Sequence, residues 1–163
     1  MSSRPLRSRQ NRKTRGRQPS LASLKAKAWK LLSQTIRGEA AAVSNDYGRV
    51  ECYTCGRSAY PQDLQAGHAI GGRSGAVLFD EEIIRPQCVR CNIMLRGNYG
   101  EFVLRLIREK AEEYRPQADP VEPVCSAVEW WSEKLLSAKQ IKKWTRSDLE
   151  AKITEYRERL ARL

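Results

Sequence analysis

The sequence lacks any apolar run close to the roughly 20 consecutive residues that a membrane-spanning helix needs. Its N-terminus is too basic and too poor in apolar residues for a secretory signal peptide. These absences argue against a membrane protein and against a secreted one. We therefore expect a soluble, cytoplasmic protein that has no membrane partner.

Acidic residues are absent from residues 1–37, whereas the same segment has eleven lysines and arginines. The whole net charge of +11 lies in this segment, because the other 126 residues hold 19 bases and 19 acids. A localised arginine-rich segment indicates a polyanion bound through its phosphates. A solubilising tail and a targeting sequence are the alternatives, but the arginine content favours nucleic acid. The side chains expected to contact DNA in this arm are Arg4, Arg7, Arg9, Arg12, Lys13, Arg15 and Arg17.

Hydrophobic residues are also few, at 40% of the chain, against 30% charged residues. The 163 residues are enough for one compact domain with appendages. This composition favours a small core that a metal ion supports over a broad sandwich or barrel.

Four of the five cysteines form two C-x-x-C pairs, Cys52/Cys55 and Cys88/Cys91, with 32 residues between the pairs. This spacing is typical of a closed, four-coordinate structural zinc site. Such a site has no open coordination position, so any chemistry must come from the residues that the metal holds in place. The fifth cysteine, Cys125, is expected to be a small buried apolar residue.

Hydrophobic periodicity and composition divide the chain into five segments. We expect a disordered arm over 1–19, a helical segment over 20–46, a zinc-bound core over 47–116, a proline-rich linker over 117–125 and a helical pair over 126–163. Ser20 is the predicted N-cap of the first helix and Gly38 its predicted end, before a short second helix over 39–43. Thr145 and Asp148 predict a capping box for the last helix.

Within the core, alternating apolar residues predict a strand over 64–70 and a short second strand over 77–79. Pro86 is expected to break the chain before the second cysteine pair. A helix is expected over 92–112, with an interruption at Gly97 or Gly100. The predicted buried stripe of that helix consists of Val103, Leu104, Ile107 and Ala111.

The chain has a single histidine, His68, and a lone histidine is most often an ordinary core or surface side chain. Its position changes this expectation. His68 lies on the predicted strand between the two cysteine pairs, and Asn92 directly follows the last cysteine. An imidazole in such a frame can deprotonate water, while a divalent ion beside Asn92 neutralises charge on a phosphate.

The order C-x-x-C, Gly-His, glycine-rich loop and C-x-x-C-Asn resembles that of HNH, or ββα-metal, nucleases built on a zinc treble clef, with phage endonuclease VII as a more distant relative. The chain is more closely similar to the phage lambda NinG (Rap) recombination-endonuclease family. The resemblance is dense over residues 47–110 and loose over the last part of the chain. The motifs that carry it are CYTCG, LQAGH, LFDEE, PQCVRCN, RGNYGEF and KKWTRSDLEAKITEYRERL.

The resemblance implies an α+β fold, with a small zinc-bound treble-clef core of the ββα-metal type and flanking N- and C-terminal helices. It implies a metal-dependent endodeoxyribonuclease that hydrolyses phosphodiesters in branched recombination intermediates, such as Holliday junctions and D-loops. The zinc ligands would be Cys52, Cys55, Cys88 and Cys91.

Roles for individual residues follow from the same resemblance. His68 would be the general base, and Asn92 would lie near a catalytic Mg²⁺ or Mn²⁺ ion. Asn98 would be a further catalytic-site residue, and Arg73 and Arg96 would clamp the phosphate.

The chain departs from the family pattern at two places. Gly67 stands where most HNH enzymes have an Asp or His metal ligand directly before the base. Ile83 and Arg85 stand where NinG-like sequences usually have an Asn and then a His. Because of Gly67, the metal ion would need another anchor, and the candidates are Gln65, Asp80, Glu81 and Glu82.

Two other functions are alternatives on sequence alone. One is a non-catalytic DNA-binding protein that uses the same zinc scaffold, and the other is an adaptor in a recombination complex that binds through the C-terminal helices. The partners implied are branched DNA and phage or host recombination proteins, in the host cytoplasm if the protein is phage-encoded. Symmetric cutting of both strands of a junction would favour a homodimer.

Overall fold

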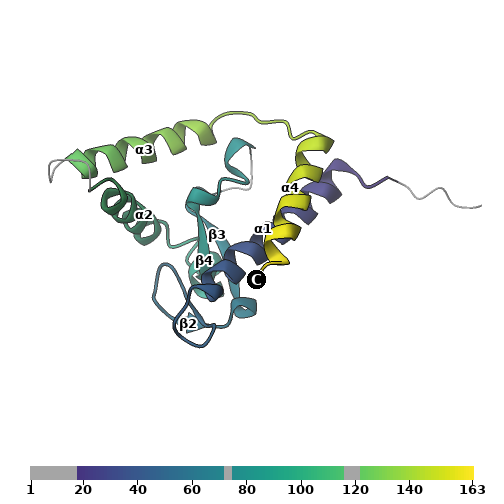
Figure 1. Ribbon diagram of the computed structural model, residues 1–163. Coiled ribbons are helices and arrows are strands. Elements are labelled where there is room, and N and C mark those ends of the chain that lie inside the picture. Colours follow the sequence, from purple (N-terminus) through teal and green to yellow (C-terminus); the bar gives the residue numbers. More distant parts are fainter. Residues whose placement is uncertain (1–17, 72–74, 116–121) are drawn as a thin grey trace, which may run out of the picture.

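The computed structural model describes residues 18–71, 75–115 and 122–163. The predicted DNA contacts of the arm and Arg73 lie outside these residues. The chain forms a mixed α/β structure with two small antiparallel sheets, β1–β2 and β3–β4 (Figure 1). Its long helices are α1 (Leu21–Ala42), α2 (Tyr99–Tyr114), α3 (Glu122–Ala138) and α4 (Arg146–Leu160). Among the described residues, no helix is long and apolar enough to span a membrane.

Helix α1 begins as the sequence predicts and ends later. The Ser20 hydroxyl accepts a hydrogen bond from the Ser23 amide at 3.2 Å, which caps the helix. The predicted end at Gly38 is wrong, because the helix continues to Ala42 and includes the segment expected to form a separate helix. The Leu163 side chain packs where a Cβ on Gly38 would lie. This packing against the chain terminus offsets the low helix propensity of glycine.

Helix α4 packs along α1 (Figure 1). The predicted capping box is present, since the Thr145 hydroxyl accepts from the Asp148 amide and the Asp148 carboxylate accepts from the Thr145 amide. Arg159 of α4 forms ion pairs with Glu39 and Glu81, each at 2.7 Å. The core of this unit consists of Leu24, Ala28, Leu32, Leu149, Ile153 and Tyr156.

The central hairpin pairs β3 (Leu64–His68) with β4 (Ile84–Cys88). The second strand expected over 77–79 is wrong, because that segment is a tight turn and β4 takes its place. Pro86 lies inside β4 and does not break the chain. Its carbonyl accepts from the Tyr53 amide at 2.8 Å, so its backbone faces away from β3 and no ladder bond is lost. The smaller sheet pairs β1 (Val50–Glu51) with β2 (Ser58–Ala59).

After β4 the chain forms a short π-helix over Arg90–Met94, reverses direction and enters α2. The predicted interruption at Gly97 is confirmed, since residues 96–98 all have positive φ values. The predicted buried stripe of α2 is partly wrong: Leu104 is 52% exposed, whereas Phe102 and Leu106 are buried. The break at Gly97 changes which residues of the helix face the core, and the hydrophobic periodicity of the sequence did not reveal this change.

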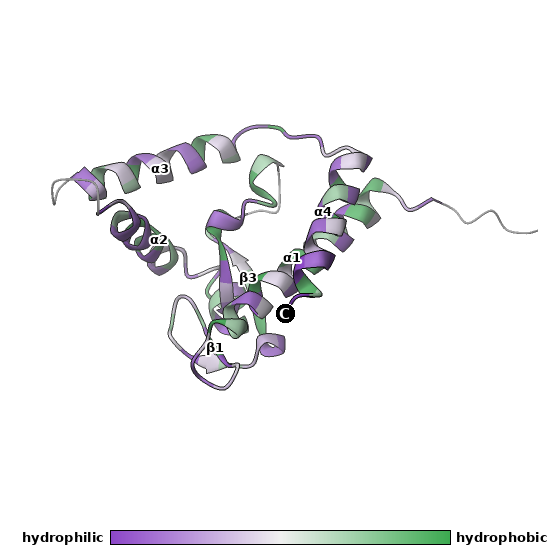
Figure 2. Cartoon of the chain, in the orientation of Figure 1, coloured by the Kyte–Doolittle hydropathy of each residue, from purple (hydrophilic) through white to green (hydrophobic). Residues whose placement is uncertain are grey.

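Helix α3 packs on α2 and buries Trp130 and Trp131. It begins at Glu122, inside the segment expected to be a linker, and Cys125 on it is exposed rather than buried. The two C-terminal helices therefore pack on different elements of the chain, α3 on α2 and α4 on α1. Figure 2 shows that these helices carry both hydrophilic and hydrophobic residues, as expected when one face covers the core.

Candidate metal centre and the adjoining pocket

The four paired cysteines converge on one point. Cys52 and Cys55 lie on the turn after β1, Cys88 ends β4, and Cys91 lies in the π-helix. Their sulfur atoms all lie within 4.8 Å of one another. Thiolates at this separation and in this number can hold a metal ion such as zinc. Among the described residues, no other group of three or more His, Cys, Asp or Glu side chains converges in this way.

Local hydrogen bonds prepare one ligand of this centre, Cys52, for a cation, whereas burial raises the pKa of the Cys91 thiol. Burial alone would raise the pKa of the Cys52 thiol, but hydrogen bonds from the backbone of Cys88 and Thr54 outweigh it and lower the pKa to about 6. The Cys88 amide lies 3.3 Å from the Cys52 sulfur. Gly56 allows the turn, since its φ is +70° and its amide donates to the Cys52 carbonyl. A thiolate held in this way is a metal ligand without further rearrangement.

His68 lies at the end of β3, opposite Ile84 and at the other end of the hairpin from Cys88. Its Nε2 atom is 3.1 Å from the Leu78 carbonyl oxygen. Because a carbonyl oxygen only accepts, Nε2 carries the proton and Nδ1 is the basic nitrogen of the neutral ring. The ring also stacks on Trp29 of α1, with the ring centroids 4.6 Å apart and the planes 17° from parallel. Trp29 is not among the site residues predicted from the sequence.

The hairpin and the π-helix bring His68 and Asn92 into one pocket of about 200 Å³. Arg96 lines the same pocket and gives the pocket a positively charged side chain. The Asn92 side-chain amide donates to Gln65 Oε1 at 2.7 Å, so a second amide group lies beside it. The remaining lining residues are Ala66, Gly71, Ile93 and Gly97. The structure therefore places the predicted base, the predicted helix-borne residue and one predicted phosphate contact together.

Asn98 is not one of the residues that line this pocket. It is the N-cap position of α2 and has a left-handed backbone with φ of +47°. Its amide donates to the Leu95 carbonyl, and its own carbonyl accepts from the Phe102 amide. These contacts indicate a role in the chain reversal, for which asparagine is suited.

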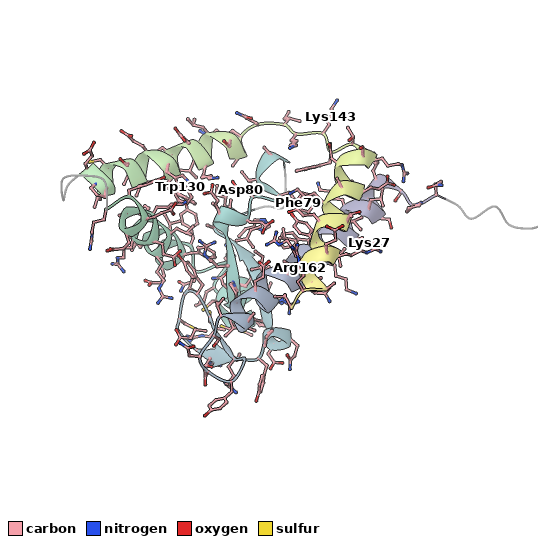
Figure 3. The ribbon with its side chains drawn as sticks, in the orientation of Figure 1. Lys27, Phe79, Asp80, Trp130, Lys143 and Arg162 are labelled. Atoms are coloured by element: carbon pink, nitrogen blue, oxygen red, sulfur yellow. The ribbon has the colours of Figure 1, made fainter. Side chains whose placement is uncertain are left out.

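Three of the four candidate metal anchors are engaged elsewhere. Asp80 pairs with Lys134 at 2.8 Å, and Glu82 pairs with both Lys134 and Lys110. Glu81 pairs with Arg159 at 2.7 Å. Figure 3 shows Asp80 between Trp130 and Phe79, beneath α3. Only Gln65 lies beside Asn92, and none of the described residues that line the pocket is a carboxylate.

A residue of the opposite strand explains why position 67 is a glycine. A Cβ atom at this position would lie 2.0 Å from Gln87 Oε1. Gln87 is fully buried, and its amide nitrogen donates to the Gly97 carbonyl at 2.8 Å and to the Thr54 hydroxyl at 3.1 Å. Gln87 thus ties the first cysteine turn to the chain reversal, and no side chain fits beside it at position 67. Sequence reasoning did not single out Gln87.

The second departure from the family pattern, at Ile83 and Arg85, also has a structural explanation. Ile83 is completely buried in the core between α2 and α3, and its carbonyl accepts from the Ala69 amide. Arg85 forms an ion pair with Glu109 at 3.2 Å and does not line the pocket of His68. The Leu78 carbonyl, which no side-chain motif reveals, contacts His68 instead.

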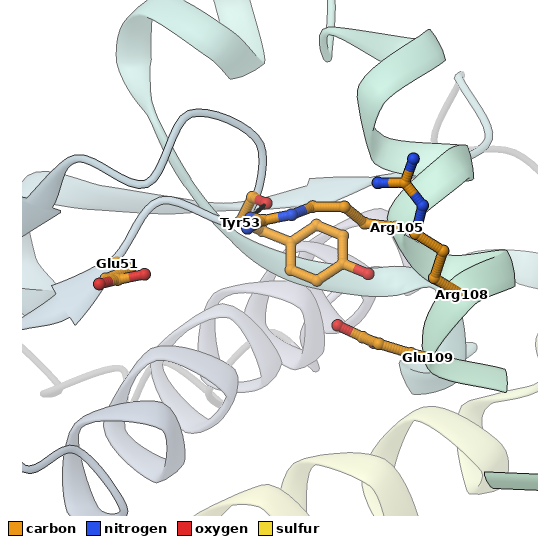
Figure 4. Close-up of a pocket in the computed structure, with 5 residues that line it drawn as sticks. All are labelled: Glu51, Tyr53, Arg105, Arg108 and Glu109. Carbon is orange, nitrogen blue, oxygen red and sulfur yellow. Dashed lines mark hydrogen bonds between the residues drawn. The ribbon is translucent and has the colours of Figure 1, made fainter. Parts of the chain in front are cut away.

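A separate pocket of about 310 Å³ lies between β1 and α2 (Figure 4). Its lining has charges of both signs and consists of Glu51, Tyr53, Arg105, Arg108 and Glu109. Burial and the nearby carboxylate raise the pKa of the tyrosine hydroxyl, which stays neutral. None of the residues predicted from the sequence lies on this pocket, so it is not the candidate site.

Comparison with known proteins gives one match. The family described as "Bacteriophage Lambda NinG protein" matches residues 2–163. No curated protein and no solved structure matches the chain.

Proposed function

Because the chain belongs to the bacteriophage lambda NinG family, we propose that it is an endonuclease of phage recombination that hydrolyses phosphodiesters in branched DNA. The observation that carries the proposal is the shared pocket of His68 and Asn92, the second of which directly follows Cys91 of the four-cysteine centre. A titratable base, an amide ligand and an arginine at one concave site suit phosphodiester hydrolysis.

In the proposed reaction His68 is the general base. The Leu78 carbonyl holds the proton on Nε2, so Nδ1 accepts a proton from the attacking water. The stacked Trp29 ring restricts the tilt of the imidazole and packs against the imidazolium that forms. Arg96 binds a non-bridging phosphate oxygen, whose charge grows as the water oxygen attacks in line with the leaving group.

The residues of the pocket fit a weakly held Mg²⁺ or Mn²⁺ ion. Asn92 would supply its amide oxygen, since its amide nitrogen donates to Gln65, and substrate phosphates and water would supply the other ligands, as is usual for Mg²⁺. Such an ion neutralises charge on the phosphate. Since no carboxylate lines the pocket in the described part of the chain, this ion would enter together with the DNA.

The four cysteines have a structural role in this proposal. A closed set of four thiolates leaves no coordination position for substrate. The centre connects the end of β4 to the π-helix that carries Asn92, and so it sets the position of Asn92 against His68. The Arg-rich arm would add affinity that falls steeply with salt.

The test is cleavage of a labelled four-way junction by purified protein with Mg²⁺. We expect His68→Ala to lower the cleavage rate by about 100-fold or more, since general base catalysis commonly contributes this much. Junction binding and metal content should stay at the wild-type level. Cleavage by the variant at the wild-type rate would show that the base is assigned wrongly.

A second function is favoured by one observation, the absence of a carboxylate from the lining of the pocket in the described residues. A DNA-binding protein without catalytic activity needs no such ligand. The same assay separates the two functions. Binding of junction DNA by wild-type protein with no cleavage in Mg²⁺ or Mn²⁺ would support the binding protein.

A further inference from the structure

Apolar side chains are exposed on the turn that follows the second cysteine pair. Met94 is 73% exposed, and its neighbours Ile93 and Leu95 are exposed as well. We call residues 93–95 the apolar tip. A cluster of exposed apolar side chains beside a polar pocket is typical of a contact surface.

The apolar tip is held by backbone contacts at both ends. The Leu95 amide donates to the Arg90 carbonyl at 2.8 Å, and the Gly97 amide donates to the Cys91 carbonyl at 2.9 Å. Gln87 donates to the Gly97 carbonyl from the buried side. Cys91 itself belongs to the four-cysteine centre. The tip is therefore preorganised, which lowers the entropic cost of inserting it into a partner.

Charge around the apolar tip fits a polyanion. Arg90 and Arg96 are exposed at its two ends, and no acidic residue occurs between positions 83 and 100. Ile93 and Arg96 also line the pocket that holds His68. A surface of this kind contacts the same ligand that enters the pocket.

We propose that the apolar tip enters DNA at a branch point and packs against unstacked bases, while Arg90 and Arg96 bind the adjoining phosphates. This inference rests on the proposed function and adds the feature of DNA that the site selects. Apolar wedges of Ile, Leu or Met separate base steps in other DNA-binding proteins, at the cost of unstacking. That cost is smaller where stacking is already interrupted, so an apolar tip favours branches over continuous duplex. A symmetric contact with a second copy would bring the arginines of both copies together, which opposes it.

The first test compares the affinities of Met94→Ser and wild-type protein for a four-way junction and for linear duplex of the same sequence, without added Mg²⁺. We expect junction affinity to fall by about tenfold, the size of a lost wedge contact. Duplex affinity should change little, so the preference for the junction falls. Met94→Leu should keep the wild-type preference. Ile141→Ser is the matched control, because Ile141 is 91% exposed on the loop between α3 and α4.

The second test follows base unstacking directly. A fluorescent adenine analogue placed at the branch should brighten when wild-type protein or Ile141→Ser binds, and should brighten less with Met94→Ser. Equal fluorescence and equal junction preference in all variants would overturn the inference. Loss of self-association in Met94→Ser, with DNA preference unchanged, would overturn it in favour of a second copy of the chain.

The two proposals fail in different ways. If wild-type protein bound neither the four-way junction nor the linear duplex, this result would refute the proposed function and the inference with it. Wild-type protein that prefers and cuts the junction, with Met94→Ser behaving identically, would refute the role of the apolar tip alone.

Discussion

The Trp29 and His68 rings stack at 4.6 Å, although Trp29 lies on α1, His68 lies on β3, and the β1–β2 sheet with its cysteine turn comes between these elements in the chain. The Leu78 carbonyl binds Nε2 of the same imidazole. One contact therefore restrains the plane of the ring and the other its rotation within that plane. Helix α1 takes part in the candidate site through Trp29, and the arm precedes the same helix.

We predict that Trp29→Ala lowers the rate of junction cleavage by about 3- to 10-fold, because a stacked aromatic pair is worth about 1 kcal/mol. Junction affinity should stay the same, and Trp29→Phe should restore most of the rate. Lys30→Ala, an exposed neighbour on α1, is the control.

The stack has a spectroscopic signature that does not depend on activity. Since His68 is the only histidine, the protein should show one set of imidazole proton resonances, shifted upfield by the indole ring. Trp29→Ala should move these resonances toward their random-coil positions, and Lys30→Ala should not. Unmoved resonances in Trp29→Ala would show that the rings do not stack in solution.

Gly67→Ala should lower the free energy of unfolding by about 1–3 kcal/mol, the usual cost of overpacking a tight site. The cause is the 2.0 Å approach of Gln87 Oε1 to a Cβ at this position. Gly71→Ala is the matched control, because no atom of the described residues lies within 4 Å of a Cβ there. In a Gln87→Ala background the cost of Gly67→Ala should shrink, and chemical denaturation measures all four variants. Fully additive effects would mean that the two positions do not touch.

The Glu82 ion pairs predict a defined dependence of stability on pH. Hydrogen bonds from Lys134 and Lys110 outweigh burial and lower the pKa of Glu82 from 4.5 to about 2. A carboxylate with a depressed pKa in the folded state stabilises the protein above pH 4.5, and this contribution is lost as the pH falls toward 2.

The expected size of the Glu82 effect is modest, because the side chain is 47% exposed and solvent screens the pairs. Glu82→Gln should lower the free energy of unfolding by about 0.5–1 kcal/mol near neutrality. The difference from wild type should vanish on acidification, and thermal unfolding at several pH values measures it. Glu129→Gln, at an exposed position of α3, is the control and should have the same stability as wild type at every pH. If the difference in the free energy of unfolding between Glu82→Gln and wild type grew toward low pH, the predicted direction of the pH dependence would be wrong.

The four-cysteine centre predicts one equivalent of bound zinc and loss of structure on strong chelation, because metal binding and folding are coupled in such sites. Cys88→Ser should lower zinc content and cooperative unfolding together. Cys125→Ser is the control, since Cys125 is exposed on α3 and apart from the cluster. Elemental analysis and circular dichroism give the two readouts, and wild-type protein without any metal would refute the centre.

Much of the local structure follows from the sequence. The cap at Ser20, the box of Thr145 and Asp148, the strand that begins at Leu64 and the break at Gly97 all appear where residue types predict them. These features depend on hydrogen bonds and backbone preferences within a few residues, which sequence patterns record. The convergence of the cysteines also follows, because the C-x-x-C spacing itself restricts how the thiolates meet.

Only the tertiary structure decided which residues far apart in the chain contact one another, including those around His68. Gly38 continues a helix because Leu163 and α4 cover it, and Pro86 fits a strand because its backbone faces away from the partner strand. Gly67 lacks a side chain because Gln87 fills that space, and the Asp80–Glu82 carboxylates bind lysines and an arginine of α2, α3 and α4. Contacts between residues far apart in the chain are set by packing and charge pairing, which no local pattern encodes. The sequence alone therefore predicted the base and the cysteine ligands, whereas folding determined which groups contact His68 and which acids are kept away from it.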